Sequence, residues 1–108
     1  HEHHHHSSHL ENDGFMAVSF TSEQPFNLEK FQFFLTDQLP TNVFRAKGIL
    51  WFDRSTLRYV FQLSGKRYSL DVDDRPIPPK NQLVFIGQNL DQDTLLRDLR
   101  ACLVKPVA

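Results

Sequence analysis

The sequence predicts an α+β fold: a two-layer domain in which two helices cover one face of a mixed, mostly antiparallel sheet of about five strands. Short apolar runs with a period of two residues indicate strands, and two segments with apolar residues three and four positions apart indicate helices. Their order is strand, helix, three-strand meander, strand, helix, which is typical of two packed layers. With 108 residues, 40% of them hydrophobic, the chain is long enough for one core.

We divide the chain into a His-rich linker at 1–13, a folded domain at 14–104 and a tail at 105–108. The sequence does not begin with Met, so we expect it to be part of a longer protein. Nowhere do 18 apolar residues lie together, which predicts no membrane span. The single cysteine, Cys102, excludes an internal disulfide and favours a cytoplasmic location.

The first strand is predicted over 15–21, with little exposure because its start is apolar on both faces. Asn27 then suits the N-cap of a helix, and Pro40 ends that helix because the residue before a proline avoids the helical region. The apolar positions of this helix are Leu28, Phe31, Phe34, Leu35 and Leu39, and we assign its two phenylalanines among them to the core.

The segment 43–52 is predicted to be the central strand. Its alternation gives one face that is apolar throughout and one that carries two cations and the only tryptophan. The face expected to be buried holds Phe44, Ala46, Gly48, Leu50 and Phe52, and the other holds Arg45, Lys47, Ile49 and Trp51. Gly48 would allow a neighbouring backbone to approach closely.

Two further meander strands are predicted over 56–63 and 66–72, joined by a tight turn at Ser64-Gly65. Tyr68, Leu70 and Val72 are expected to point inward, and Asp71, Asp73 and Asp74 to be solvated near the Pro-rich loop that follows. The solvent face of the meander is expected to carry Arg45, Lys47, Trp51, Arg58, Gln62 and Arg67.

A buried strand over 82–87 and a last helix capped by Asp91 complete the domain. The apolar stripe of that helix is Leu95, Leu96, Leu99, Cys102 and Leu103. We expect Cys102 to be a small core residue, since a reactive thiol would need exposure and a cationic neighbour.

The folded part contains few residues in patterns typical of catalytic sites. All histidines lie before residue 10, so no Ser-His or Cys-His pair can form within the domain, and no metal-ligand spacing occurs there. The four glycines are isolated, so no phosphate-binding loop exists. The net charge of -1 gives no general attraction to nucleic acid. We therefore predict that the domain is not an enzyme and holds no cofactor of its own.

The N-terminal tract has two interpretations. Neutral imidazoles bind Zn and similar divalent ions, so a native metal tract is one, and an affinity tag is the other. The candidate metal ligands are His1, His3, His4, His5, His6 and His9.

Segments 45–51 and 83–87, with the shorter segments around them, give the domain a resemblance to the C-terminal domain of the CobW family. The resemblance runs from about Asp13 to about Leu103. It rests mainly on two strand motifs, which are specific for the family when they occur together. The matching segments are 45–51 (RAKGILW), 83–87 (LVFIG), 90–91, 13–15, 18–20 and 25–26.

The resemblance implies a GTP-dependent metallochaperone that delivers Zn or Co to client proteins or to cobalamin synthesis. Its P-loop GTPase domain, which would hold the GTP and the main metal site, is not in this sequence and would be a partner of this domain, as would a metal-requiring client. Because the family linker is often His-rich, the resemblance favours the native metal tract.

Three interpretations of the basic strand face remain open. It docks the GTPase domain or a client; it binds single-stranded RNA through basic and stacking residues; or it is a solvated face without a partner. We favour docking, with Arg45, Lys47, Trp51 and Arg58 as the contact residues.

Overall fold

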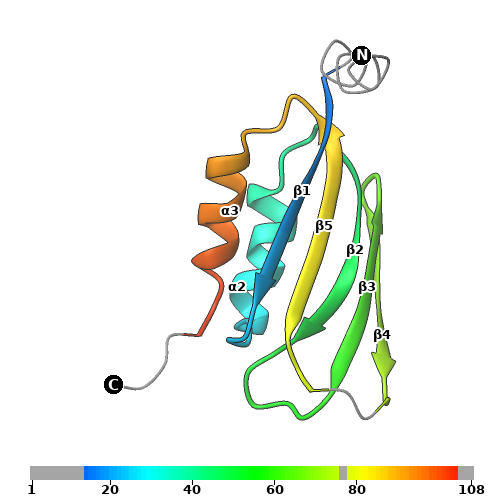
Figure 1. Cartoon of the computed structure of the whole chain (residues 1–108), viewed down its shortest axis with the longest axis vertical. Helices are drawn as coiled ribbons and strands as arrows, with labels where there is room; N and C mark the ends of the chain where they lie inside the picture. Colours follow the sequence, from blue (N-terminus) through cyan, green and yellow to red (C-terminus); the bar gives the residue numbers. More distant parts are fainter. Residues whose placement is uncertain (1–13, 76–77, 105–108) are drawn as a thin grey trace, which may run out of the picture.

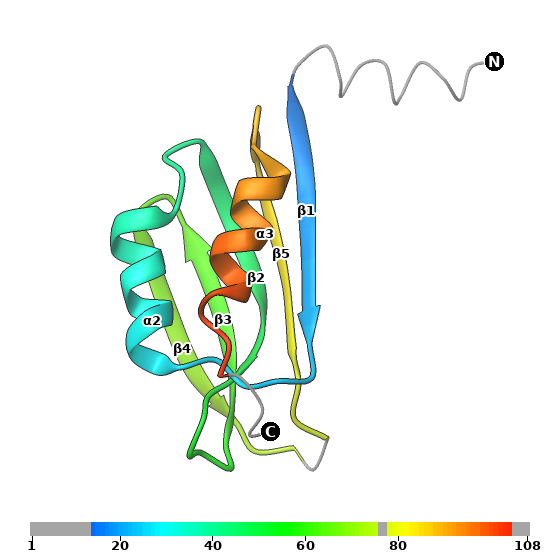
Figure 2. The same cartoon turned by 90° about the vertical axis from the view of Figure 1, so that its left-hand side faces the viewer.

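The computed structural model describes residues 14–75 and 78–104. The elements are β1 (Phe15–Ser22), α2 (Leu28–Phe33), the π-helical segment η1 (Phe34–Gln38), β2 (Val43–Trp51), β3 (Arg58–Ser64), β4 (Arg67–Asp73), β5 (Asn81–Gln88) and α3 (Gln92–Arg100). The predicted α+β class is confirmed. Both helices lie on one face of a five-stranded sheet (Figures 1 and 2).

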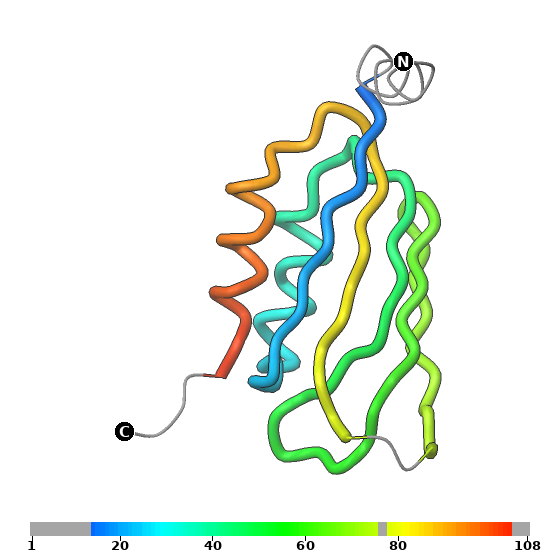
Figure 3. The backbone as a smooth tube through the Cα atoms, viewed as in Figure 1, coloured from blue at the N-terminus to red at the C-terminus, as the bar shows by residue number. Residues whose placement is uncertain are grey.

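The strand order is β1-β5-β2-β3-β4, and every neighbouring pair is antiparallel. The chain forms the predicted meander through β2, β3 and β4, and β5 then returns between β1 and β2 (Figure 3). β2 and β5 therefore have a paired strand on each side, whereas β1 and β4 are edges. Among the described residues, no helix has the length and apolar character needed to cross a bilayer.

Phe31 lies at the centre of the core, between sheet and helices. It is 1% exposed, and its ring packs against four other phenylalanine rings with centroid distances from 4.9 to 6.0 Å. These rings belong to Phe26, Phe34, Phe52 and Phe61. The assignment of Phe31 and Phe34 to the core is thus confirmed, whereas Leu28, at the first turn of the helix, is exposed.

Both predicted helix caps are present. The Asn27 side chain accepts a hydrogen bond from the Lys30 backbone N–H at 2.9 Å, and that of Asp91 accepts one from the Thr94 N–H at 3.2 Å. Each satisfies a donor that the first turn of a helix leaves free. Cys102 is buried, and burial raises the pKa of its thiol to about 11.

The face assignment of Phe44 was wrong. The register between β2 and β5 shifts between Val43 and Arg45, as in a β-bulge. The extra residue allows Val43 to take the core position, at 4% exposure, and leaves Phe44 40% exposed. Beyond the bulge the predicted alternation holds, with Ala46 and Leu50 buried.

Two expectations about exposure fail, one on each edge strand. β1 alternates between buried and exposed residues along its length, although little exposure was predicted. On β4, Tyr68 and Val72 stand on the helix-side face but remain exposed. On β1, the buried Val18 and Phe20 face the helices and the exposed residues lie on the opposite face of the sheet. β4 has a neighbouring strand on one side only, so its outer residues keep contact with water.

Candidate functional site

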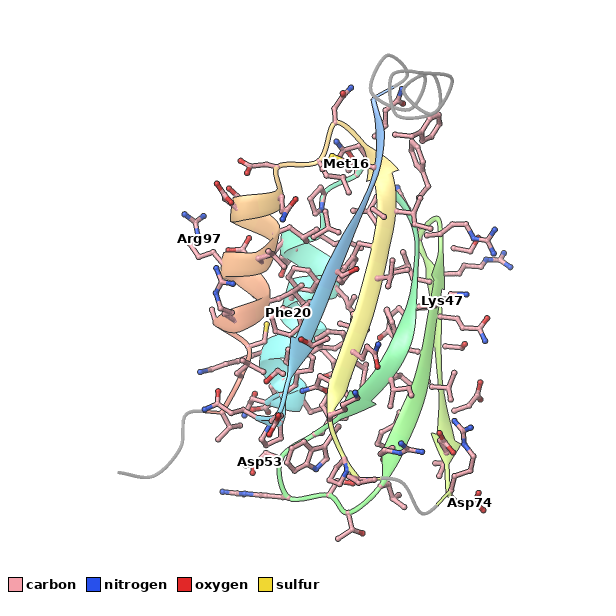
Figure 4. The ribbon with its side chains drawn as sticks, viewed as in Figure 1. Met16, Phe20, Lys47, Asp53, Asp74 and Arg97 are labelled. Carbon is pink, nitrogen blue, oxygen red and sulfur yellow. The ribbon has the colours of Figure 1, made fainter. Side chains whose placement is uncertain are left out.

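The candidate site is the sheet face opposite the helices, which we call the open face. Strand register places Lys47 between Gln62 on β3 and Val84 on β5, and places Arg45 beside Ile86. All five side chains therefore share the open face. Lys47 projects from this side, while Arg97 projects from α3 on the other side of the molecule (Figure 4).

A groove of about 470 Å³ runs over the open face. Its cations are Arg45 and Lys47 from β2 and Arg67 from β4, and Val84 and Ile86 supply apolar surface. We call this the basic groove. No carboxylate is among the described residues that line it, and within the described ranges none of its three cations forms an ion pair. The groove is therefore a local positive site on a chain whose net charge is -1.

An exposed aromatic pair lies at the bulge end of the sheet. The rings of Phe15 and Phe44 meet edge to face with centroids 5.9 Å apart, and both side chains remain exposed. Phe15 pairs with Gln88 on β5. Ile86 lies two residues before Gln88 on the same strand and is 41% exposed. Apolar surface thus continues from the basic groove toward this end of the sheet.

Arg58 is not a surface contact, which corrects its assignment as a docking residue. Its side chain is 4% exposed, and its Nη2 donates to Asp73 Oδ2 at 2.8 Å. The two residues are direct partners in the β3–β4 ladder. Because the carboxylate lies opposite, the guanidinium is held against the sheet instead of extending into water.

Asp73 was predicted to be solvated, and this too was wrong. Its side chain is 6% exposed and also accepts bonds from Arg75, from Nε at 3.0 Å and from Nη2 at 2.8 Å. These bonds from Arg75, with the Arg58 charge, hold the pKa of the Asp73 carboxyl well below its ordinary value. The cluster of Arg58, Asp73 and Arg75 joins the ends of β3 and β4.

Trp51 lies on the open face but apart from the basic groove. It is opposite Arg58 at the far end of β2, four residues beyond Lys47, or about 13 Å along the strand. Its indole N–H donates to the Ser55 carbonyl at 3.3 Å, and its backbone N–H donates to the buried Asn81 side chain. The structure therefore brings Arg45 and Lys47 together and separates Trp51 from them.

The contribution of β5 to the groove was missed from the sequence. Val84 and Ile86 belong to a run that is apolar throughout, and nothing in that run indicates which β2 residues it faces. The Arg58–Asp73 pair did have a signal. The hairpin loop consists of Gly65 and Lys66, so Ser64 lies opposite Arg67. Counting outward from this pair places Arg58 opposite Asp73.

The predicted metal ligands between His1 and His9 lie outside the described residues. Within the described ranges, no group of three or more His, Cys, Asp or Glu side chains could hold a metal ion.

The geometry defines an α+β domain whose antiparallel sheet is covered by helices on one face and is open and basic on the other. The family model described as "Cobalamin synthesis protein cobW C-terminal domain" matches residues 15–103. The chain belongs to this family, and the predicted resemblance is confirmed.

Two solved structures share the fold. The chain is 21% identical to the Zn(II)-bound YjiA GTPase from E. coli, with a TM-score of 0.75, over 87% of this chain and 31% of that one. It is 22% identical to a Zn(II)-bound triple mutant of YjiA GTPase, with a TM-score of 0.74, over 84% of this chain and 30% of that one. The chain therefore spans about a third of the length of these structures.

Proposed function

We propose that this chain is the partner-docking C-terminal domain of a GTP-dependent metallochaperone, and that a P-loop GTPase domain belongs to the same whole protein. The match to the cobW C-terminal family over residues 15–103 carries the proposal. The fold shared with two YjiA GTPase structures, of which this chain covers only about a third, supports it. A P-loop in the coding sequence adjoining this domain is the expected result, and an unrelated neighbour would contradict the proposal.

In this proposal the domain does not hydrolyse GTP by itself. Phosphate binding by a P-loop needs glycines close together before a helix that begins with Lys and Ser or Thr. The glycines here are isolated, and each serves a turn or a strand. Calorimetry of the 108-residue chain should detect no GTP binding at micromolar concentrations, and clear binding would contradict this assignment.

The proposed docking surface is the open face around Arg45 and Lys47, with Trp51 as an outlying contact. Arg45 and Lys47 form no ion pair with another described residue, so they can pair with a partner, and adjacent apolar surface adds contact area. RNA binding has less support, because the predicted stacking residue, Trp51, lies apart from Arg45 and Lys47 with its indole N–H bonded to Ser55, and the net charge of the chain is -1. Arg58 is not part of this surface, because its side chain is buried against Asp73.

We also propose that the His-rich segment 1–13 gathers Zn or Co for delivery, in the cytoplasm, to a metal-requiring client or to cobalamin synthesis. Removal of residues 1–13 should abolish Zn uptake measured by equilibrium dialysis. Stoichiometric Zn retained by the shortened chain would contradict the assignment.

The docking proposal is tested by titrating the chain with the separately produced GTPase domain of the whole protein. Lys47→Glu should weaken association at least tenfold, because it reverses a charge at the centre of the surface. Arg97→Glu, the same change on α3, should leave association unchanged. Equal effects from both variants would contradict docking through the open face.

A further inference from the structure

The basic groove presents two parallel rows of side chains. Arg45 and Lys47 form a basic row on β2, and their direct partners on β5, Ile86 and Val84, form an apolar row. Residues two apart on a strand are about 6.8 Å apart, and neighbouring strands are about 4.8 Å apart. Arg67, two strands from Arg45, adds positive charge on the side away from the apolar row. A ligand must match both rows at once.

The backbone of these strands excludes an added strand at this place. β2 and β5 are each paired on both sides, so neither has a free row of N–H and C=O groups. An extended peptide laid over Val84 and Ile86 would lose water from its backbone without finding hydrogen-bond partners. An α-helix bonds its own backbone, and helices pack on open sheet faces, as α2 and α3 do on the other side.

The charges specify the helix further. The three groove cations have no carboxylate among the described groove residues, so they complement acidic side chains. On a helix, residues at i and i+4 are about 5–6 Å apart, close to the spacing of Arg45 and Lys47. An adjacent apolar stripe on that helix would then lie over Ile86 and Val84.

We propose that the basic groove binds an acidic amphipathic α-helix of a partner protein, with Glu or Asp spaced four residues apart beside a stripe of apolar residues. The inference rests on the proposed docking function and specifies the chemistry of what docks. Binding of an amphipathic helix, which places its side chains into a groove, is an established mode of peptide recognition. The exposed Phe15 and Phe44 pair would extend the apolar contact at one end.

The test uses fluorescence anisotropy with the full 108-residue chain and a labelled 18-residue peptide. This peptide carries Glu at i and i+4 positions and Leu on the neighbouring stripe. A scrambled peptide of identical composition keeps the charge and removes both stripes. The striped peptide should bind at least tenfold more tightly than the scrambled one. Lys47→Glu and Arg67→Glu should each weaken it at least tenfold, and Arg97→Glu should change it less than twofold.

Three outcomes would overturn the inference. Equal binding of the two peptides would show general attraction to negative charge. Labelled single-stranded RNA that binds more tightly than the striped peptide, and more weakly to Lys47→Glu, would identify a nucleic-acid surface. If neither peptide binds while the GTPase domain still binds through Lys47, the helix inference fails and the docking function stands. Circular dichroism confirms that each variant is folded, and the two groove variants supply independent tests.

Discussion

Gly48→Ala tests how closely β2 and β5 pack at the centre of the sheet. A Cβ atom at Gly48 would lie 1.9 Å from the Gln82 carbonyl oxygen and 2.8 Å from Leu83 Cα. Both are backbone atoms of β5, so no side-chain rotation can relieve the contact. The two central strands must therefore move apart.

The expected cost is large for a small domain. Overpacking a well-packed interior costs about 1–3 kcal/mol, and each ladder hydrogen bond that the movement breaks costs about 0.5–1.5 kcal/mol more. We expect Gly48→Ala to lower the free energy of unfolding by roughly 3–5 kcal/mol, a large part of the 5–15 kcal/mol of a typical domain. With a urea slope of about 1–3 kcal/mol/M, the unfolding midpoint should fall by at least about 1 M.

Trp51, the only tryptophan, provides the fluorescence signal for the urea titration. Gly65→Ala is the matched control. A Cβ there meets no atom within 4 Å, so only its positive φ of 62° opposes the change, at about 1–2 kcal/mol. If Gly48→Ala costs no more than Gly65→Ala, the reasoning about strand spacing is refuted.

Three further predictions concern stability and reactivity. Leu50→Ala, at a buried site, should cost about 2–5 kcal/mol, whereas Phe44→Ala should cost about 1 kcal/mol, mainly its ring contact with Phe15; equal costs in urea titrations would contradict the bulge. Because the folded-state pKa of Asp73 is lowered, its stabilisation is present above about pH 4 and is lost below it. Asp73→Asn should therefore lose less stability than the parent between pH 7 and pH 3, and equal losses would count against this. Since the pKa of Cys102 is about 11, its thiol should react with a disulfide reagent at pH 8 at least tenfold more slowly in the folded chain than in urea.

Local chemistry explains what could be predicted from the sequence. The caps at Asn27 and Asp91 and the turn at Ser64-Gly65 depend on residues within a few positions of each other, and the structure contains all three. The alternation of β2 predicted the shared open face of Arg45 and Lys47 for the same reason. The predicted close approach at Gly48 is also confirmed.

Long-range pairing explains what could not be predicted. The bulge beside Phe44 depends on how β2 meets β5, about forty residues later in the chain, and period-two counting along β2 alone cannot detect an extra residue. The apolar row of the basic groove has the same origin, because Val84 and Ile86 join the site only through that register. The wrong assignment of Arg58 has a different origin. The predicted turn at Ser64-Gly65 sets the register of the two strands, and that register already pairs Arg58 with Asp73.

Heteronuclear NMR can locate the surface through which this domain docks. The ¹⁵N-labelled chain is titrated with the unlabelled GTPase domain of the whole protein, and the backbone amide signals are followed. Docking through the open face predicts that signals of Arg45, Lys47, Val84 and Ile86 shift or broaden first, while those of α3 around Arg97 stay in place. Changes confined to α3, or no changes at saturating concentrations of the GTPase domain, would contradict it.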